Sequence, residues 1–553
     1  MATWVKYLVG VLATLGILAG TGWVFRAEIA LWGTSQVMSS QMGEIGPAQE
    51  INWSSAVDAR DKSERPPNIV LILADDLGWN DISMNGPNPT TETPHIDALA
   101  EGGVTFTQGY AANATCAPSR AALMSGRYGT RFGFEFTPTP TGFMPIVGLV
   151  SDTRDRPLMP PGISNTETAE LEYAEMGMPA SEVTLAEVLK DKGYHTVHIG
   201  KWHLGNTNGM AAHEQGFAES LLMASGLYGR ADDEDVIQAR QEFDPIDRFL
   251  WSAMRFAARF NGGPLFEPPR YLTDYYTDEA VKVIEANKDR PFFLYLAHWA
   301  PHTPLQAARE DYEALSHIEL HRERVYAGMI RSLDRGVGRV MEALKANGID
   351  DNTLVMFTSD NGGADYIGLP DVNDPYRGWK ITLFEGGLRV PFLARWPARL
   401  PAGETFDDPV HHFDMFATAA AAAEADMPTD RVMDGVDLVS HVNGDVSEAP
   451  HDYLFFRSGA AQAVRDDKWK LVVSAPPGGE RKEWLFDLSA DGEWTDLLAQ
   501  HPEIADRLRG ELSAHNAAQM EPRWPWTGTT ARNVDRDLSQ DDQPGDEFAY
   551  WSN

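Results

Sequence analysis

The chain contains a single cysteine, Cys116, among its 553 residues. One thiol cannot close a disulfide within the chain, and it cannot supply the cysteine cluster of a structural zinc site. An unpaired thiol is a liability in an oxidising compartment unless it has a function or is chemically altered. The sequence therefore raises the question of what Cys116 does.

Basic residues are scarce relative to acidic ones. The chain has 46 Lys and Arg against 81 Asp and Glu, which gives a formal net charge of −35. Such an excess of negative charge argues against nucleic acid or an anionic lipid surface as a partner, because both would be repelled. Charged residues make up 23% and hydrophobic residues 43% of the chain, which is typical of a globular protein with a large core.

Only one long uncharged apolar run is present, YLVGVLATLGILAGTGWVF between Lys6 and Arg26. Its length suits a helix that crosses a ~30 Å hydrocarbon layer. An exported signal peptide is the alternative, but no small-residue cleavage site precedes Arg26, which favours an uncleaved anchor. We expect five segments: an anchor or signal sequence at 1–26, a linker at 27–66, a main domain at 67–440, a C-terminal subdomain at 441–526 and a loose acidic tail at 527–553.

Apolar runs alternate with helical patterns through the main domain. Short continuous apolar runs typical of strands buried on both faces lie within 67–78, 195–202, 291–302, 351–363 and 389–397. Helical spacing appears between them, at 181–193 and 324–348. The pattern predicts an α/β fold with a large, mostly parallel sheet covered by helices on both faces. After about residue 440, short strands and one helix predict a small antiparallel subdomain.

Polar residues stand where the predicted strands end. Asp75 and Asp76 follow the first strand, and Asp360 and Asn361 follow another. The remaining polar strand-end residues are Lys201, His203 and His302. Each pattern alone is compatible with a turn or a helix cap. Because ligands of open parallel sheets bind beyond the carboxyl ends of the strands, we expect all of them to face one crevice.

The side chains of this set divide into two chemical kinds. Asp75, Asp76, Asp360 and Asn361 offer only oxygen, which suits a hard cation such as calcium or magnesium and not zinc. The cationic or proton-carrying residues are Arg120, Lys201, His203, His302 and Lys380. A divalent cation surrounded by cationic donors suits a tetrahedral oxyanion. The predicted substrate is a sulfate or phosphate ester.

The segment CAPSRAALMSGR, which begins at Cys116, resembles the signature of the type I sulfatases. Five further segments resemble the same family in the same order, namely DDLGWNDI, GKWHLG, APHTPLQ, SDNGG and RGWKITLFEGGLRVP. The resemblance runs from about residue 68 to about residue 525. It implies an alkaline phosphatase-like fold and an arylsulfatase-like enzyme that hydrolyses aryl or carbohydrate sulfate esters.

The resemblance implies that a formylglycine-generating enzyme oxidises Cys116 to formylglycine, an aldehyde. One hydroxyl of the hydrated aldehyde attacks sulfur, and deprotonation of the second expels sulfate. The resemblance also implies one Ca²⁺ per chain, bound by Asp75, Asp76, Asp360, Asn361 and the modified Cys116. It further implies that Arg120 and Lys201 hold the hydrated aldehyde, that His203 takes the proton that triggers sulfate release, and that His302 and Lys380 bind sulfate and protonate the leaving oxygen.

Two alternative functions remain open at this point. A phosphonate or phosphate ester hydrolase of the same superfamily would use the same kind of site. A carbohydrate-binding protein could retain the pocket without the chemistry. The resemblance implies an extracytoplasmic enzyme, most simply in a bacterial periplasm, which is either anchored in the membrane or exported. We expect specificity to reside in two insertions, 134–180 and 206–270, and in the C-terminal subdomain. The aromatic residues of the second insertion either line a platform for a sugar or pack in the core, and packing is the favoured interpretation; they are Tyr228, Phe249, Trp251, Phe256 and Phe260.

Overall fold

The computed structural model describes residues 25–86, 89–139, 143–151, 162–163, 171–476, 479–526 and 528–552. The predicted anchor or signal sequence at 1–26 lies almost entirely outside these residues. Within the described ranges, no helix combines the length and the apolar character that a membrane crossing requires.

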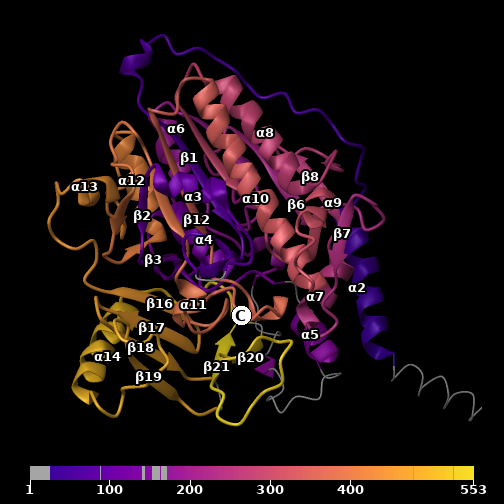
Figure 1. Ribbon diagram of the computed structural model, residues 1–553, viewed down its shortest axis with the longest axis vertical. Coiled ribbons are helices and arrows are strands. Elements are labelled where there is room, and N and C mark those ends of the chain that lie inside the picture. Colours follow the sequence, from indigo (N-terminus) through magenta and orange to yellow (C-terminus); the bar gives the residue numbers. More distant parts are fainter. Residues whose placement is uncertain are drawn as a thin grey trace, which may run out of the picture.

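A ten-stranded mixed sheet forms the centre of the molecule (Figure 1). In spatial order its strands are β14 (Glu404–Phe406), β2 (Val104–Phe106), β13 (Phe392–Arg395), β12 (Thr353–Ser359), β1 (Asn68–Ala74), β10 (Phe292–Ala297), β5 (His195–Gly200), β6 (Glu219–Gly226), β8 (Phe256–Phe260) and β9 (Leu265–Phe266). The five strands from β12 to β6 are parallel, whereas β13, β8 and β9 pair in the antiparallel sense. The predicted α/β fold with a mostly parallel sheet is confirmed.

Two layers of helices cover the sheet. One face carries α3 (Pro94–Glu101), α8 (Leu272–Asn287) and α10 (His321–Ala346), and the other carries α4 (Cys116–Ser125), α6 (Leu185–Asp191) and α12 (His412–Ala422). Strand β1 is buried along its whole length and sends Val70 and Ile72 into the first core and Ile69 and Leu71 into the second. Each such side chain contributes roughly 1.5–3 kcal/mol through burial.

The predicted C-terminal subdomain is an antiparallel sheet with one helix against it. Strands β16 (Leu454–Ser458), β17 (Ala461–Arg465), β18 (Trp469–Ser474) and β19 (Lys482–Asp487) pair in sequence order. Helix α14 (Pro502–Ala517) packs on this sheet through Ala505, Leu508 and Leu512. The subdomain lies at one end of the molecule, at the lower left of Figure 1.

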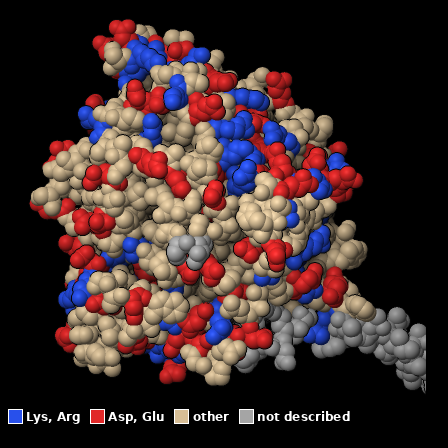
Figure 2. Space-filling view, viewed as in Figure 1, with Lys and Arg blue, Asp and Glu red and all other residues tan. Residues whose placement is uncertain are grey.

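The remaining elements are short or lie at the edges. They are α2 (Arg26–Met42), β3 (Gly109–Tyr110), α5 (Phe143–Ser151), β4 (Gly162–Ile163), β7 (Val236–Ala239), α7 (Pro245–Ala253), β11 (Leu305–Ala308), α9 (Arg309–Ala314), α11 (Glu385–Leu388), β15 (Val410–His411), α13 (Leu438–Val442), β20 (Gly528–Asn533) and β21 (Phe548–Ser552), together with 3-10 turns at Lys62–Glu64, Trp79–Asp81, Gly129–Phe132, Tyr173–Glu175, Ala212–Glu214 and Asp365–Ile367. Acidic and basic side chains are interspersed over the face seen in Figure 2.

The structure differs from the sequence prediction at three places. The first part of the predicted 27–66 linker is helix α2, which packs beside α5 and α7. The predicted insertion at 206–270 supplies β6, β8 and β9 to the main sheet. The predicted loose tail at 527–553 contains β20 and β21, which form a three-stranded sheet with β4. Acidic residues of that tail pair with basic residues of the body, as Asp535 does with Arg377 at 2.6 Å, so their charge does not keep the tail loose.

Candidate active site

The predicted polar residues meet beyond the carboxyl ends of the parallel strands. Asp75 and Asp76 follow β1, and Asp360 and Asn361 follow β12, which is the neighbour of β1 in the sheet. The remaining predicted site residues are Cys116 and Arg120 in α4, Lys201 and His203 after β5, His302 after β10, and Lys380 in the loop before α11. Hydrogen bonds, ion pairs or the lining of one cavity connect all ten residues.

Cys116 is the first residue of helix α4, and its side chain is buried beneath the cavity. The unpaired amide groups and the dipole of a helix N-terminus favour an anion at this position. The helix is held from behind, because the Ser119 hydroxyl accepts a hydrogen bond from the Ala112 amide at 3.1 Å and bonds the imidazole of His412 at 3.0 Å. Arg120 lies one turn further along, on the same face as Cys116.

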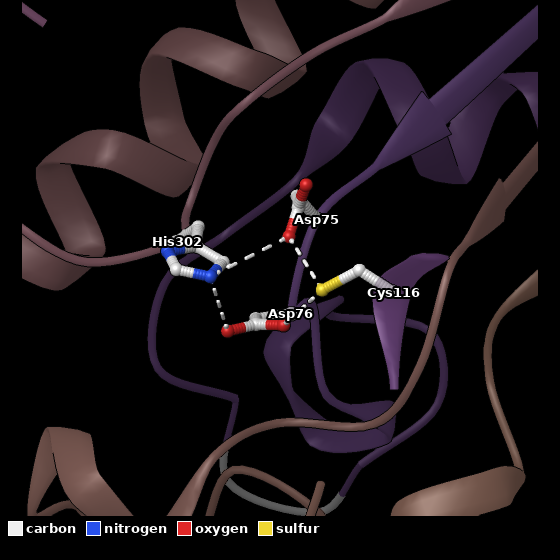
Figure 3. Close-up of side chains that lie close together, drawn as sticks. All are labelled: Asp75, Asp76, Cys116 and His302. Atoms are coloured by element: carbon white, nitrogen blue, oxygen red, sulfur yellow. Dashed lines mark hydrogen bonds and ion pairs between the residues drawn. The ribbon is translucent and has the colours of Figure 1, made fainter. Parts of the chain in front are cut away.

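Four side chains converge at the centre of the site (Figure 3). The Cys116 thiol lies 3.6 Å from Asp75 Oδ1 and 3.8 Å from Asp76 Oδ1. His302 Nε2 lies 3.5 Å from Asp76 Oδ2 and 4.0 Å from Asp75 Oδ1. One potential ligand atom from each residue lies within 4.8 Å of those of the other three, and all four residues are buried. The group therefore has the dimensions of a metal centre.

Three cations neutralise the buried carboxylates. Arg120 donates to Asp75 Oδ2 at 2.7 Å and to Asp360 Oδ2 at 2.8 Å, and Lys201 Nζ lies 2.7 Å from Asp75 Oδ2. Lys380 Nζ lies 2.7 Å from Asp76 Oδ1 and 3.3 Å from the Cys116 sulfur. Fully buried ion pairs of this kind require a partner for each charge, so the constellation is stable only as a set.

Burial and neighbouring charges shift the protonation equilibria at the site. Burial, reinforced by the Asp360 carboxylate, raises the pKa of Asp75 to about 6. Burial also acts to raise the pKa of Asp76, but the charges of His302 and Lys380 outweigh it and hold this pKa far below its ordinary value. Burial, followed by the Asp360 and Asp75 carboxylates, raises the pKa of Cys116 well above its ordinary value. The unmodified thiol is therefore neutral and a poor nucleophile.

The oxygen atoms fit a hard divalent cation. Asn361 donates through Nδ2 to Asp76 Oδ1 at 2.8 Å, while its own Oδ1 is buried without a hydrogen-bond partner. A cation beside Asp76 would satisfy that oxygen, since amide and carboxylate oxygens are the ligands that calcium and magnesium prefer. Asp360 Oδ1 lies 3.3 Å from the Asp76 amide nitrogen, which places the fourth predicted ligand in the same group.

The backbone is strained next to the site. Asp76 and His203 adopt φ angles of +63° and +64°, and Ile381, which follows Lys380, adopts +83°. A β-branched residue rarely adopts the left-handed region, at a cost of the order of 1–3 kcal/mol. The Ile381 amide donates to the Ala114 carbonyl at 2.7 Å, which holds the Lys380 loop against the segment that leads to Cys116.

Two site residues, Tyr366 and Trp299, were missed by the sequence analysis. The Tyr366 hydroxyl donates to Asp76 Oδ2 at 2.8 Å and accepts from Lys380 at 2.9 Å. The indole of Trp299 stacks on the His302 ring at a centroid distance of 3.8 Å, with Lys201 Nζ 4.4 Å from the indole centroid. Trp299 directly precedes the APHTPLQ motif that contains His302, which was a usable signal, whereas no local pattern marked Tyr366. Tyr228, which the sequence assigned to packing, donates to the Trp299 carbonyl at 2.7 Å.

A cavity of about 370 Å³ opens above this centre. Its floor consists of Cys116, Lys201, His302 and Lys380, and His203 stands at its side. The His203 Nδ1 atom is buried without a hydrogen-bond partner. Burial, and then the charge of Lys201, lower the pKa of His203 well below its ordinary value, so that its imidazole is neutral and can accept a proton.

Residues 67–425 match the sequence model of the Sulfatase family. The chain belongs to the sulfatase family. N-acetylgalactosamine-6-sulfatase of Mus musculus is 33% identical to it over 417 residues, which cover 73% of this chain and 72% of that protein. Steryl-sulfatase of Mus musculus is 31% identical over 566 residues, which cover 84% and 85%. The protein is a sulfatase, and the predicted family is confirmed.

The crystal structure of Ps i-CgsB superposes on this sulfatase with a TM-score of 0.67 and 31% sequence identity, over 83% of this chain and 95% of that chain. That protein has also been solved in complex with k-i-k-neocarrahexaose. The phosphonate monoester hydrolase of Silicibacter pomeroyi, at 18% identity and a TM-score of 0.57, shares the fold alone.

Proposed function

We propose that this sulfatase hydrolyses sulfate esters at residue 116 after conversion of Cys116 to formylglycine, with Ca²⁺ bound among Asp75, Asp76, Asp360 and Asn361. The observation that carries the proposal is the convergence of a buried thiol, four oxygen ligands and three cations at one helix N-terminus. Such a centre suits the tetrahedral, singly charged sulfate group of an ester, whose negative charge must be held while the bond to the alcohol oxygen breaks.

The aldehyde explains the environment of Cys116. The thiol is neutral and buried, so that as a thiol it would contribute little to catalysis. When formed, the hydrated aldehyde supplies one hydroxyl to attack sulfur and a second whose deprotonation frees sulfate. The position of the Cys116 sulfur stands in for these hydroxyls, and Lys380 and the Asp75 carboxylate already lie within 3.6 Å of it.

The oxygen ligands and the orphaned Asn361 Oδ1 support the calcium proposal. Bound Ca²⁺ would polarise the sulfate oxygens and offset their electrostatic repulsion by the surrounding carboxylates. Arg120 and Lys201 would hold the hydrated aldehyde, and both already contact Asp75 Oδ2. Asp360, held by Arg120, would help deprotonate the attacking hydroxyl. His203, neutral and without a partner at Nδ1, would accept the proton whose loss triggers sulfate release.

The proton for the leaving oxygen would come from the His302–Lys380 pair. The Nδ1 atom of His302 lies 2.5 Å from the Thr303 carbonyl oxygen, so Nδ1 must donate and Nε2 faces the site. Lys380 Nζ lies 3.4 Å from that Nε2 atom. Nearby carboxylates, with Asp76 first among them, outweigh burial and keep the pKa of Lys380 above its ordinary value. Lys380 therefore carries the proton, and His302 orients it.

One set of assays tests the proposal. Protein made together with a formylglycine-generating enzyme should show, by peptide mass spectrometry, a residue 116 that lacks sulfur and reacts with hydrazides. This protein should release sulfate from 4-nitrophenyl sulfate, lose the activity on chelation and regain it with calcium. Full activity with an unmodified Cys116 would refute the aldehyde, and activity that survives chelation and responds to zinc would refute the metal assignment. Faster cleavage of a phosphonate or phosphate monoester would instead support the alternative hydrolase.

We propose an extracytoplasmic location, with residues from about 27 onward outside a bacterial cytoplasm. The proposal rests on the apolar run before Arg26 and on the polarity of sulfate esters, which do not cross a bilayer. The protein should remain with washed membranes and yet be degraded when protease is added to spheroplasts. Protection from the protease would overturn the proposed orientation.

A further inference from the structure

The cavity above Cys116 has an apolar wall facing its charged floor. Helix α7 supplies Ile246, Phe249, Leu250, Ala253 and the following Met254. These positions are spaced by three, one, three and one residues, so they form one face of a helix. Ile246, Trp251 and Met254 also pack in part against the first core, so the wall is fixed to the body of the molecule while Ile246 and Met254 line the cavity.

The cap of α7 fixes this wall in place. The Asp244 carboxylate accepts hydrogen bonds from the Ile246 amide at 2.9 Å and from the Asp247 amide at 2.8 Å. Phe249 is further held by an edge-to-face contact with Phe143 of α5, with the ring centroids 4.8 Å apart. A wall whose side chains are held in this way is preorganised to receive a ligand.

Helix α2, which packs beside α7, extends the lining of the same cavity. Met38 and Met42, one helical turn apart, line it. The helix is tied to α7 because the Arg255 guanidinium donates to the Ser35 carbonyl at 3.1 Å and to the Ser35 hydroxyl at 2.9 Å. Strand β6 adds Leu222 and Met223. Methionine side chains adapt to irregular apolar ligands.

Charge is confined to the floor of the cavity. Among the described residues that line the cavity, the basic side chains are Lys201, His203, His302 and Lys380. All four belong to the sulfate site. These lining residues include no Asp, Glu or Arg and a single carboxamide, Asn206. Their hydroxyl groups come from Thr115, Thr137, Thr139, Tyr173, Ser225 and Tyr366, and none of these belongs to the walls from α2 and α7. A sugar presents hydroxyl groups in every direction, and burying them without partners is unfavourable.

We propose that the alcohol portion of the natural substrate is a bulky apolar group, a fused-ring or long-chain alcohol or phenol, and that Met38, Phe249 and Leu250 determine this specificity. The proposal rests on the proposed sulfate ester hydrolysis and narrows it from aryl or carbohydrate esters to apolar ones. The charged floor would hold the sulfate while the walls from α2 and α7 enclose the rest, in a cavity of the size that small-molecule ligands use.

A series of 4-alkylphenyl sulfates from methyl to hexyl tests this proposal with the matured full-length protein. The alkyl group changes the apolar area while the acidity of the leaving phenol stays nearly constant. Each methylene buried against the walls should raise kcat/KM about fourfold until the cavity is full. Galactose 6-sulfate and N-acetylgalactosamine 6-sulfate serve as polar comparison substrates, and kcat/KM for them should be at least about tenfold lower than for the hexyl ester.

Two matched variants locate the effect. Met38→Gln places a polar group in the cavity, whereas Val37→Gln changes the adjacent α2 residue, which is 54% exposed and does not line the cavity. Met38→Gln should reduce the gain per methylene by at least half, and Val37→Gln should leave it unchanged. Leu250→Gln provides a second test from α7. The near-ultraviolet circular dichroism spectrum and the urea unfolding midpoint of each variant, matched to those of the unsubstituted protein, show that it is folded.

The outcomes separate the two proposals. If the matured protein releases sulfate from none of these esters, the proposed sulfate ester hydrolysis fails. If it cleaves the methyl ester but shows no gain with chain length, or prefers a sugar sulfate, the apolar specificity is wrong and the hydrolysis stands. If Met38→Gln and Val37→Gln change the gain in kcat/KM per methylene equally, α2 does not contribute to the specificity.

Discussion

Replacing Lys470 by Met should destabilise the protein strongly, and more at alkaline than at acidic pH. Lys470 in β18 is fully buried between two carboxylates, with Nζ 2.8 Å from Glu385 Oε1 and 2.8 Å from Glu493 Oε1. Both carboxylates are buried to 1% exposure or less. This cluster joins the C-terminal sheet to α11, which directly follows the loop of Lys380.

The magnitude follows from the charges that remain. Glu385 keeps Arg389 as an ion-pair partner at 3.5 Å, whereas Glu493 loses its cation and keeps the Glu385 amide as a donor. Leaving one buried charge uncompensated costs about 3–5 kcal/mol. Removing the Glu493 carboxylate as well should restore part of the lost free energy of unfolding. The double variant Lys470→Met with Glu493→Gln should therefore be more stable than Lys470→Met alone.

The dependence on pH has a definite sign. Burial, opposed mainly by Lys470, raises the pKa of Glu493 to about 7 from its ordinary 4.5. A carboxyl group that binds its proton more tightly in the folded state favours folding when protonated, so stability falls as the pH rises from about 4.5 to about 7. Without Lys470 the pKa of Glu493 rises further. Each unit of this rise, up to pH 8, adds about 1.4 kcal/mol to the stability that the protein loses between acidic pH and pH 8.

Urea unfolding at pH 5.5 and pH 8, followed by intrinsic fluorescence, measures both effects. Lys468→Met is the matched control, because Lys468 lies near the start of β18 and makes a half-exposed ion pair with Asp487 at 2.9 Å. Its loss should change stability by less than about 1 kcal/mol. Equal stability of the two variants at pH 8 would refute the charge argument. An equal loss at both pH values would refute protonation of Glu493.

Three further predictions concern catalysis and folding. Asp360→Asn should lower calcium affinity at least about tenfold, measured as bound calcium after dialysis, because the ligand set loses a charge; unchanged calcium content would exclude Asp360 as a ligand. His302→Asn should lower kcat by about 10²–10⁴ for phenyl sulfate and by less for 4-nitrophenyl sulfate, since an activated leaving group needs less protonation; an equal loss for both esters would contradict a role in proton donation. Asp244→Ala should cost about 0.5–2 kcal/mol in urea unfolding through loss of the α7 cap, and no change would show that the cap does not stabilise the wall.

The central strands were predictable because their residues carry the signal themselves. Strand β1 is buried at all seven positions, so its sequence is a continuous apolar run. Helix α2 was missed because its apolar side chains do not mark one buried face: Ile29, Trp32 and Val37 are exposed, whereas Met38 and Met42 line the cavity. Strands β20 and β21 were missed because their segment is rich in polar and acidic residues that become paired only in the folded chain.

The oxygen-bearing part of the site was predictable for a related reason. Asp75 and Asp76 follow the apolar strand β1, Asp360 and Asn361 follow the neighbouring strand β12, and the order of a parallel sheet places such positions together. The apolar wall could not be predicted, because Met38 and Phe249 are more than 200 residues apart and neither segment signals the other. Phe249 was expected to pack, and it instead lines the cavity, while Phe256 lies in the core.

The burial of Cys116 sets an order of events for biosynthesis. Cys116 is 5% exposed and contacts Lys380 and the carboxylates of Asp75 and Asp76. A modifying enzyme therefore cannot bind this segment as an extended peptide once α4 has formed. Under the proposed conversion to formylglycine, oxidation of residue 116 would therefore have to compete with folding of the newly made chain. A chain that folded before this conversion would keep an unmodified Cys116 and be inactive. It would differ from the active enzyme only at residue 116. The specific activity of a preparation would then depend on the rate of oxidation of residue 116 relative to the rate of folding in the cell that produced it.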